Sequence, residues 1–342
     1  EQEELGISNN TRKTINLNNN PDRHKYFSKN GAEMLQTVAI RTPKYLCIKD
    51  NSLIIREKGS SVVLGKIALS DIWVIIIDNP QVTMTSALIS GINDAGIGVL
   101  YCGSDHMPNG LALPLGAHSR HAEIVEHQLA ISKPLRNQIW KRLVTKKIEN
   151  QAKALALCFG DSAEVKKIRG YAQEVQSNDK TNRESIAASE YFKALLPYGT
   201  RWNGPMTAPL NYGYAILRSG IAQCAVSHGW LVSRGIHHHS AENAFNLVDD
   251  LIEPFRPIVD LKVVSDNILE PLSTQNKKAL TEITSVLVSI DGRRHSVQTA
   301  IDIYCESLRR AVELKDAGQL LLPDIIGLER ETYEEKRAKG KV

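Results

Sequence analysis

Residues 235–257, GIHHHSAENAFNLVDDLIEPFRP, combine three consecutive histidines with an acidic segment that ends at Arg256 and Pro257. The pattern is typical of one loop followed by one helix. It gathers imidazoles, carboxylates and a guanidinium, the side chains of a divalent-metal site that handles phosphates. A second polar segment, residues 179–184, could supply a further ligand. Together the two segments suggest metal-assisted phosphodiester chemistry.

A helical wheel over residues 242–260 separates an apolar side from a polar side. Asp250 and Glu253 are three positions apart, so their carboxylates would be neighbours on such a helix. Adjacent carboxylates repel each other, and a divalent cation is a common remedy. Oxygen ligands suit Mg²⁺ or Mn²⁺, and an added imidazole favours a transition metal such as Mn²⁺. The alternative is an acidic, solvated helix face on which Arg256 is a local ion-pair partner.

Two of the candidate ligands also have structural alternatives. The histidine run could form a metal site, a pH-sensitive loop or simply polar surface. Glu184 lies in Thr181-Asn182-Arg183-Glu184, which fits a capping box, where the glutamate binds the amide at the start of its own helix. Neither a Walker A sequence nor G-x-G-x-x-G occurs, so ATP hydrolysis and dinucleotide redox chemistry are disfavoured.

The composition is that of an ordinary soluble globular protein, with 342 residues, 42% hydrophobic and 23% charged. Five scattered cysteines with no C-x-x-C pair predict reduced thiols in a cytoplasmic protein and argue against a zinc cluster. The apolar runs are too short to span a bilayer, so we expect no membrane insertion.

The net charge of +4 permits nucleic-acid binding without requiring it. A short segment that we expect to be helical carries several cations with little opposing charge. It could contact a DNA backbone or be a solvated helix face. Its basic residues are Lys133, Arg136, Lys141, Arg142, Lys146 and Lys147.

Along the chain we expect an α+β fold, with a small N-terminal β-rich domain followed by a larger all-α catalytic domain. Residues 1–36 predict a polar, disordered arm, because they are poor in apolar residues. Residues 37–117 carry β-branched runs and a hairpin signal around Asp50-Asn51-Ser52. Residues 118–320 have helical periodicity, and residues 321–342 form a charged tail. Expected helices cover 119–131, 134–159, 162–176, 182–196, 207–228, 241–262 and 294–315, with a kink or restart near Glu253.

Four motifs occur in an order and spacing that resemble the CRISPR adaptation integrase family (Cas1), most closely its type II form. They are Asn182-Arg183-Glu184 with Ala187-Ala188 and Tyr191-Phe192, then residues 210–217, residues 235–238 and residues 245–257. The resemblance covers about residues 37 to 320. Residues before 37 depart from the family pattern and have no assigned role.

The resemblance implies a β domain, a helical catalytic domain and a homodimer. It implies that Glu184, His238 and Glu253 are the catalytic residues and bind one Mg²⁺ or Mn²⁺. Asp250 matches a second acidic position near the metal, and Arg256 matches a basic position that could touch phosphate. His238 is chosen over the neighbouring histidines because it has the family spacing to Gly235 and Phe245.

The implied reaction is transesterification of double-stranded DNA. The 3′-hydroxyl of a prespacer attacks a phosphodiester at the edge of a CRISPR repeat. The family works with a small ferredoxin-like subunit (Cas2) that bridges two dimers, and other type II CRISPR proteins could take part. Two alternatives stay open: a structure-selective nuclease that uses water at the same site, and a non-catalytic DNA-binding scaffold.

Overall fold

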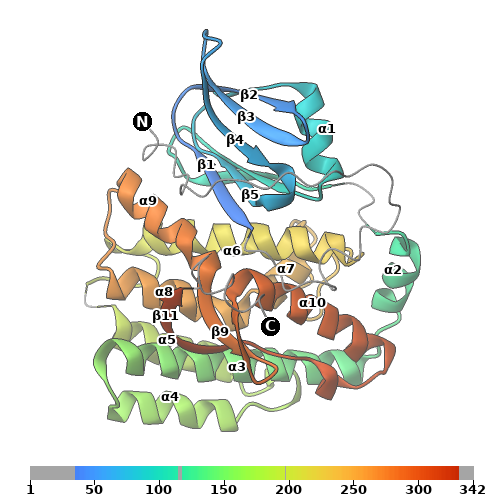
Figure 1. The fold of residues 1–342 in the computed structure, drawn as a ribbon. Coiled ribbons are helices and arrows are strands. Elements are labelled where there is room, and N and C mark those ends of the chain that lie inside the picture. The colour runs from blue at the N-terminus through green and yellow to red at the C-terminus, as the bar shows by residue number, and fades with distance from the viewer. Residues whose placement is uncertain (1–34, 115–117, 197, 331–342) are drawn as a thin grey trace, which may run out of the picture. The chain divides into compact units, whose positions relative to one another are not determined.

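The computed structural model describes residues 35–114, 118–196 and 198–330 (Figure 1). The described residues fall into two compact units, which divide between Gly110 and Leu111. The disordered arm expected at residues 1–36 lies outside the described residues up to residue 34, and Gln36 begins the first strand. No helix in the described ranges is both long enough and apolar enough to cross a membrane.

The N-terminal unit contains two sheets. One has the order β1-β5-β7-β8, and the other has the order β4-β3-β2-β6. Strand β5 pairs in parallel with β1 and with β7, and every one of its residues is buried. A continuous apolar run is what a strand in the middle of a parallel sheet requires. The strands are β1 (Gln36–Ile40), β2 (Lys44–Lys49), β3 (Ser52–Glu57), β4 (Val63–Ala68), β5 (Ile72–Ile77), β6 (Thr83–Met84), β7 (Gly98–Cys102) and β8 (Pro108–Ala112).

The predicted hairpin is confirmed. Strands β2 and β3 are antiparallel, and Lys49 pairs with Ser52 across a two-residue turn. Asp50 and Asn51 fill that turn with φ angles of 50° and 51°. A two-residue hairpin turn needs positive φ at both positions, and Asp and Asn tolerate it better than most residues. Helix α1 (Ser86–Asp94) then packs on β2, and a Cβ on its Gly91 would lie 2.4 Å from the Ile48 side chain.

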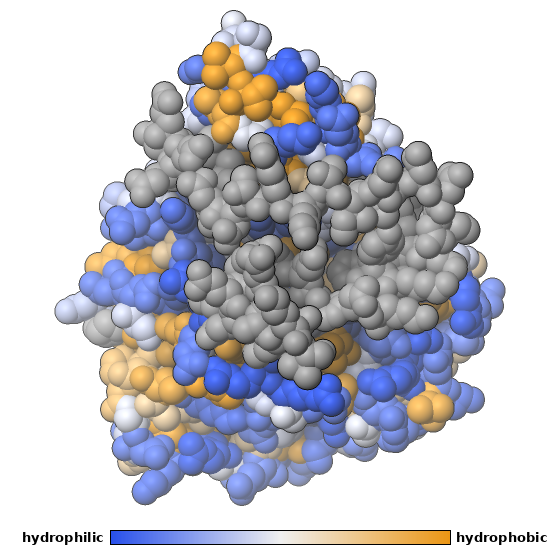
Figure 2. Space-filling model, viewed as in Figure 1, coloured by the Kyte–Doolittle hydropathy of each residue, from blue (hydrophilic) through white to orange (hydrophobic). Residues whose placement is uncertain are grey.

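The second unit is mainly helical. Helix α3 is its longest and lies between α4 and α8 (Figure 1). Ser132 caps α3, and Pro134 occupies its first turn as expected. Over α3 and α4 the surface seen in Figure 2 is mostly hydrophilic, with apolar residues interspersed. The helices are α2 (His121–Leu129), α3 (Lys133–Phe159), α4 (Ala163–Gln173), α5 (Arg183–Leu195), α6 (Thr207–Ser227), α7 (Asn246–Leu251), α8 (Arg256–Ser265), α9 (Thr274–Thr281) and α10 (Val297–Glu313).

The expected all-α catalytic domain is overstated. A three-stranded antiparallel sheet has the order β10-β9-β11, formed by β9 (Val286–Ile290), β10 (Arg293–Ser296) and β11 (Asp324–Arg330). Strand β9 alternates buried with half-buried residues, the pattern of a strand with one face on the core. Strand β11 lies within the segment interpreted as a tail, and residues 331–342 are outside the described residues.

The helical segment expected over residues 241–262 is divided into two helices, and the first begins only at Asn246. Helix α7 ends at Leu251, a single 3-10 turn η4 (Glu253–Phe255) follows, and α8 begins at Arg256. The predicted restart near Glu253 is confirmed. Pro254 and Pro257 lack an amide hydrogen, so neither can continue the hydrogen-bond ladder of a preceding helix.

A buried carboxylate joins three helices of this unit. Asp260 on α8 accepts hydrogen bonds from the hydroxyls of Tyr191 on α5 and Tyr214 on α6, and it is only 1% exposed. Burial raises the pKa of Asp260 to about 6, although the two tyrosine hydrogen bonds lower it. Because its pKa is higher in the folded chain than the unfolded value of 3.8, the folded state holds an extra proton between about pH 4 and pH 6.

This linkage predicts how stability depends on pH. Stability from Asp260 is fully present below about pH 4 and is lost as the pH rises through about 6, a change of about 3 kcal/mol. Between pH 4 and pH 7, the free energy of unfolding of the wild type should fall by about 3 kcal/mol more than that of Asp260→Asn. Urea denaturation at several pH values measures both, and parallel curves would contradict the prediction. Tyr191→Phe removes a hydrogen bond that stabilises the ionised form of Asp260, so it should raise the pKa of Asp260 further. The decline in stability should then extend to higher pH.

Candidate active site

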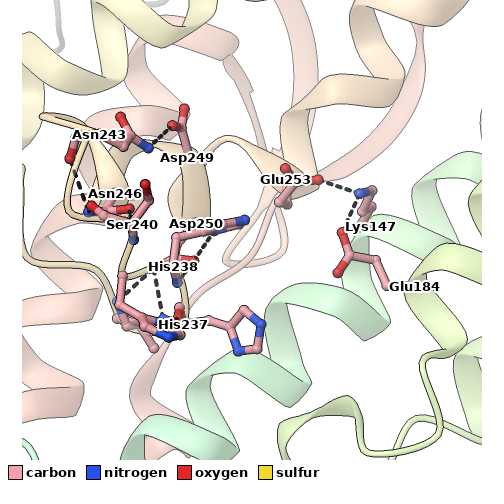
Figure 3. Close-up of polar contacts among 12 residues, drawn as sticks. Lys147, Glu184, His237, His238, Ser240, Asn243, Asn246, Asp249, Asp250 and Glu253 are labelled. Atoms are coloured by element: carbon pink, nitrogen blue, oxygen red, sulfur yellow. Dashed lines mark hydrogen bonds and ion pairs between the residues drawn. The ribbon is translucent and has the colours of Figure 1, made fainter. Parts of the chain in front are cut away.

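Two of the predicted ligands meet at a buried lysine. The ammonium group of Lys147, on α3, lies 2.6 Å from Glu184 Oε1 and 2.5 Å from Glu253 Oε2 (Figure 3). Glu184 is in the first turn of α5, and Glu253 opens η4. Lys147 and Glu253 are only 9% and 5% exposed. A helix, a helix N-terminus and a 3-10 turn therefore direct three charged side chains to one point.

The surrounding charges keep Glu253 and Lys147 ionised. Burial opposes ionisation of Glu253, but the cations of Arg256 and Lys147 outweigh it and lower its pKa to about 2. Burial likewise opposes the charge on Lys147, whereas Glu253 and Glu184 raise its pKa. Arg256 Nε donates to Glu253 Oε1 at 2.8 Å, and its guanidinium lies 4.8 Å from the centre of the Tyr214 ring. The two cations thus balance the two carboxylates.

The capping-box alternative for Glu184 is wrong. The carboxylate of Asp179 caps α5, because it accepts from the amides of Arg183 at 2.8 Å and Glu184 at 3.0 Å. The buried hydroxyl of Thr181 has no hydrogen-bond partner. Asn182 turns the chain into the helix with a φ of 53°. With its helix capped by another residue, the Glu184 side chain is left to bind Lys147.

The histidine loop, residues 235–240, is organised by the carboxylate of Asp250. The carboxylate of Asp250 is fully buried and accepts hydrogen bonds from three successive amides, those of Ile236, His237 and His238, at 2.6, 2.9 and 3.1 Å. A Cβ on Gly235 would lie 2.8 Å from Asp250 Oδ2 and 2.2 Å from the His238 carbonyl oxygen. Only glycine allows the loop to fold this closely around the carboxylate.

Asp250 also fixes the orientation of His238. His238 Nδ1 donates to Asp250 Oδ1 at 2.6 Å, so in the neutral ring the lone pair is on Nε2. This hydrogen bond raises the pKa of His238, and the charges of Asp250, Glu253 and Glu184 add to it. A carboxylate on the far ring nitrogen is the usual support of a metal-binding histidine. The additional acidic residue predicted near the metal therefore acts through His238.

The other two histidines have different surroundings. His237 stacks face to face on Trp140 of α3, with ring centres 4.1 Å apart and planes 3° from parallel. His238 meets the same indole edge-on at 5.7 Å. Burial lowers the pKa of His237. His239 is exposed and hydrogen-bonds the His237 carbonyl. Trp140 was missed in the sequence because nothing distinguishes it from an ordinary core residue of a helix.

Asn246 and Arg218 hold the remainder of the loop and were also missed. The Asn246 amide donates to the carbonyl groups of Ser233, Ser240 and Asn243, at 2.9 to 3.1 Å. Arg218 on α6 makes a two-point ion pair with Asp249. Beside the loop is a cavity of about 310 Å³, lined by residues 233–241, Arg136, Asn243 and Asn246. The cavity gives the histidines an open side.

The donor set of Glu184, Glu253 and His238 Nε2 fits a divalent cation. Two carboxylates and one imidazole suit Mn²⁺ or Mg²⁺. Glu253 Oε2 is a buried oxygen without a hydrogen bond, since its contact with Lys147 lacks hydrogen-bond geometry. Within the described residues, these three side chains do not bring their ligand atoms all within 4.8 Å of one another. The ammonium group of Lys147 lies between the two carboxylates, where a metal ion bound by both would have to lie.

The basic segment does not form one exposed face. Lys147 is buried at the two carboxylates, not on the surface. Arg142 donates to the carbonyl of Leu320 at 2.8 Å, and Lys146 pairs with Glu149 and Asp324. Arg136 donates to the Ile131 carbonyl and lines the cavity beside the histidines. Lys133 is exposed and Lys141 is half-buried. DNA contact by this segment therefore remains a prediction for its more exposed members.

Comparison with known proteins gives one consistent result. The family described as CRISPR associated protein Cas1 matches residues 38–299. The CRISPR-associated endonuclease Cas1 of Neisseria meningitidis serogroup C is 36% identical over 307 residues, which cover 87% of this chain and 99% of the relative.

Two solved structures share the fold. A casposase bound to integration product has a TM-score of 0.66 at 18% identity, covering 90% of this chain and 98% of the casposase. A Cas6-RT-Cas1–Cas2 complex has a TM-score of 0.68 at 14% identity, covering 89% of this chain and 37% of that longer chain. Since the family match spans more than half of the residues and the relative is similar over nearly its whole length, this chain belongs to the Cas1 family of CRISPR-associated proteins.

Proposed function

We propose that this protein is a metal-dependent DNA integrase of CRISPR adaptation. One observation carries the proposal: Glu184 and Glu253 converge on one buried ammonium group, and the charges of both carboxylates act on His238, whose Nδ1 is held by Asp250. Burying a carboxylate such as that of Glu253 is unfavourable unless cations compensate it. Membership of the Cas1 family and the fold shared with a casposase bound to integration product support this function.

In this proposal Glu184, Glu253 and His238 Nε2 hold one Mg²⁺ or Mn²⁺. The bound metal would polarise the scissile phosphate and stabilise the charge that develops on it. Asp250 keeps the Nδ1 proton of His238, so that Nε2 stays available. Arg256 holds Glu253 by a hydrogen bond and is stacked on Tyr214, which leaves its outer face for a phosphate oxygen.

The reaction exchanges one phosphodiester for another. The 3′-oxygen of the prespacer forms a bond to phosphorus at the repeat edge, the bond to the departing 3′-oxygen breaks, and the proton passes from one hydroxyl to the other. We further propose double-stranded prespacer and repeat DNA as substrates, a homodimer, and a Cas2 subunit as partner. The Cas1–Cas2 complexes that share the fold support this partnership. Other type II CRISPR proteins would join in the cell.

A cytoplasmic location is part of the same proposal, because all five cysteines lack disulfides. A structure-selective nuclease is the second candidate. The name endonuclease given to the similar protein of Neisseria favours it, and water would replace the 3′-hydroxyl at the same site. A scaffold without catalysis is less favoured, because buried carboxylates around one position serve no purpose in DNA binding.

The first prediction concerns the reaction itself. Purified protein with its Cas2 partner should join labelled prespacer DNA to a plasmid at repeat edges in Mn²⁺ or Mg²⁺, and chelation should abolish joining. His238→Ala should lower the rate at least about 100-fold, because it removes one proposed ligand. His239→Ala is the matched control, since the exposed neighbouring imidazole should be dispensable.

Gel separation of joined from hydrolysed products distinguishes the candidates. Full joining by His238→Ala would refute the site. Metal-dependent cutting without joining would favour the nuclease. DNA binding without any product at any metal concentration would favour the non-catalytic scaffold.

The second prediction concerns Lys147. Lys147→Met should destabilise the metal-free protein by up to about 3 kcal/mol at neutral pH, because it removes one of the two cations beside the buried Glu253 carboxylate and leaves only Arg256. Mn²⁺ should then restore stability, with a larger rise in melting temperature than in wild type. Lys146→Met, the adjacent residue with partly exposed ion pairs, should cost about 1 kcal/mol or less. Thermal unfolding with and without Mn²⁺ measures these effects, and an Mn²⁺ response of Lys147→Met no larger than that of wild type would rule out the shared cation position.

A further inference from the structure

A second group of metal-ligand side chains lies at the end of α6, outside the proposed active site. Cys224 and His228 are four positions apart at the C-terminus of α6, and Asp302 and Cys305 face them from α10. Within the described residues, the ligand atoms of Cys224, His228 and Asp302 all lie within 4.8 Å of one another. The end of α6 thus contributes two donors and α10 contributes one, and the fully buried Cys305 lies on α10 three positions after Asp302.

The distances are close to those of a tetrahedral zinc site. Zinc binds sulfur at about 2.3 Å and nitrogen or oxygen at about 2.0–2.2 Å, so neighbouring ligand atoms in a tetrahedron lie about 3.3–3.8 Å apart. Cys224 Sγ is 3.9 Å from Asp302 Oδ1. His228 Nε2 is 2.8 Å from the same oxygen, so this pair would open by roughly half an ångström on binding.

The other nitrogen of His228 already has its supporting carboxylate. His228 Nδ1 lies 3.5 Å from Glu306 Oε2, and Glu306 is held in turn by a two-point ion pair with Arg309. A histidine whose far nitrogen faces a carboxylate is oriented for metal binding through its near nitrogen. The group is also well shielded, since Cys305 is fully buried, Cys224 is 9% exposed and the His228 side chain is 18% exposed.

We propose that Cys224, His228 and Asp302 hold a zinc ion that ties the end of α6 to α10. Three protein donors from two helices leave the fourth position of the tetrahedron to water. The site goes beyond the proposed integrase function and does not depend on it. Zinc binding releases the Cys224 thiol proton and the Nε2 proton of His228 to solvent, so affinity rises with pH.

The location gives the site a role in holding the histidine loop. The chain leaves α6 at His228 and enters residues 229–240, which end just after His237-His238-His239. The start of this stretch is already held by α2, where His121 Nδ1 hydrogen-bonds the Gly229 carbonyl and Gln128 bonds both polar groups of the Leu231 backbone. Zinc would fix the preceding turn and so define where the loop begins.

The competing interpretation is an ion-pair network without metal. Burial opposes the charge on His228, but its hydrogen bonds with Asp302 and Glu306 outweigh this and raise its pKa to about 10. In that state the imidazolium satisfies both carboxylates, and the raised pKa of Cys224 keeps its thiol protonated. The test must therefore detect the metal and its cysteine ligand directly.

Cobalt reports cysteine ligation because thiolate-to-cobalt charge transfer gives an intense near-ultraviolet band. The full-length protein, stripped with chelator and titrated with Co²⁺, should develop this band and lose it when Zn²⁺ is added. Mass spectrometry of metals should find about one zinc per chain after dialysis. The His238→Ala variant should give the same results, which separates this site from the proposed active site.

The variants assign the ligands. Cys224→Ser and His228→Asn should each lower zinc affinity more than about 100-fold, and Glu306→Gln, which removes support for His228, about 10- to 100-fold. Cys158→Ser on α3 is the matched control and should leave the cobalt band unchanged. Far-UV circular dichroism checks that each variant folds. A folded wild type that gives no charge-transfer band, or a band that survives in Cys224→Ser, would overturn the proposal without relying on any unstable variant.

Discussion

The ammonium of Lys147 between the carboxylates of Glu184 and Glu253 is the interaction on which the site depends. The Glu253 carboxylate could not be buried without a cation beside it, because an unpaired buried charge costs several kcal/mol, whereas the Glu184 side chain is a quarter exposed. The requirement explains the local architecture. Helix α3 crosses the unit with one lysine turned inward, α5 begins where Asp179 can cap it, and the chain breaks at η4 so that Glu253 points toward α3. A divalent metal would satisfy the same carboxylates, which makes the lysine its natural competitor.

Helix α6 links the parts of this site that lie far apart in the sequence. Tyr214 packs on Arg256 and binds Asp260, and Arg218 holds Asp249. At its end, Cys224 and His228 face α10 just before the histidine loop begins. One rigid helix thus orients both the acidic segment that carries Glu253 and the loop that carries His238. If zinc binds at the end of α6, it holds the chain where it leaves this helix, and Asp250 holds the histidine loop further along.

Much of the fold was predictable because its signals are local. The hairpin at Asp50 and Asn51 follows from residues that accept positive φ, and the restart near Glu253 follows from two prolines that cannot continue a helix. The sheet of β9, β10 and β11 was not predicted. Its strands are short, and its third strand lies in a segment whose charge resembles that of a tail.

The sequence singled out Glu184 and Glu253, which meet in the structure, but it did not predict the contacts that they make. The wheel placed Asp250 and Glu253 on one face because it assumed a continuous helix. Because the helix is interrupted at η4, Asp250 contacts the histidine loop and Glu253 contacts Lys147 on α3. Lys147 resembled its surface neighbours, because the direction of a side chain on a long helix is set by packing with distant segments. The contact of Cys224 with Asp302 was hidden for the same reason, since 78 positions separate residues that two packed helices bring together.

The most direct test is a crystal structure grown with Mn²⁺ and recorded at a wavelength where manganese scatters anomalously. This account predicts one strong anomalous peak in contact with Glu184, Glu253 and His238 Nε2, with the Lys147 ammonium moved away from at least one carboxylate. Two results would contradict it. One is manganese bound only elsewhere in the molecule while Lys147 still bridges both carboxylates. The other is a peak that does not touch His238.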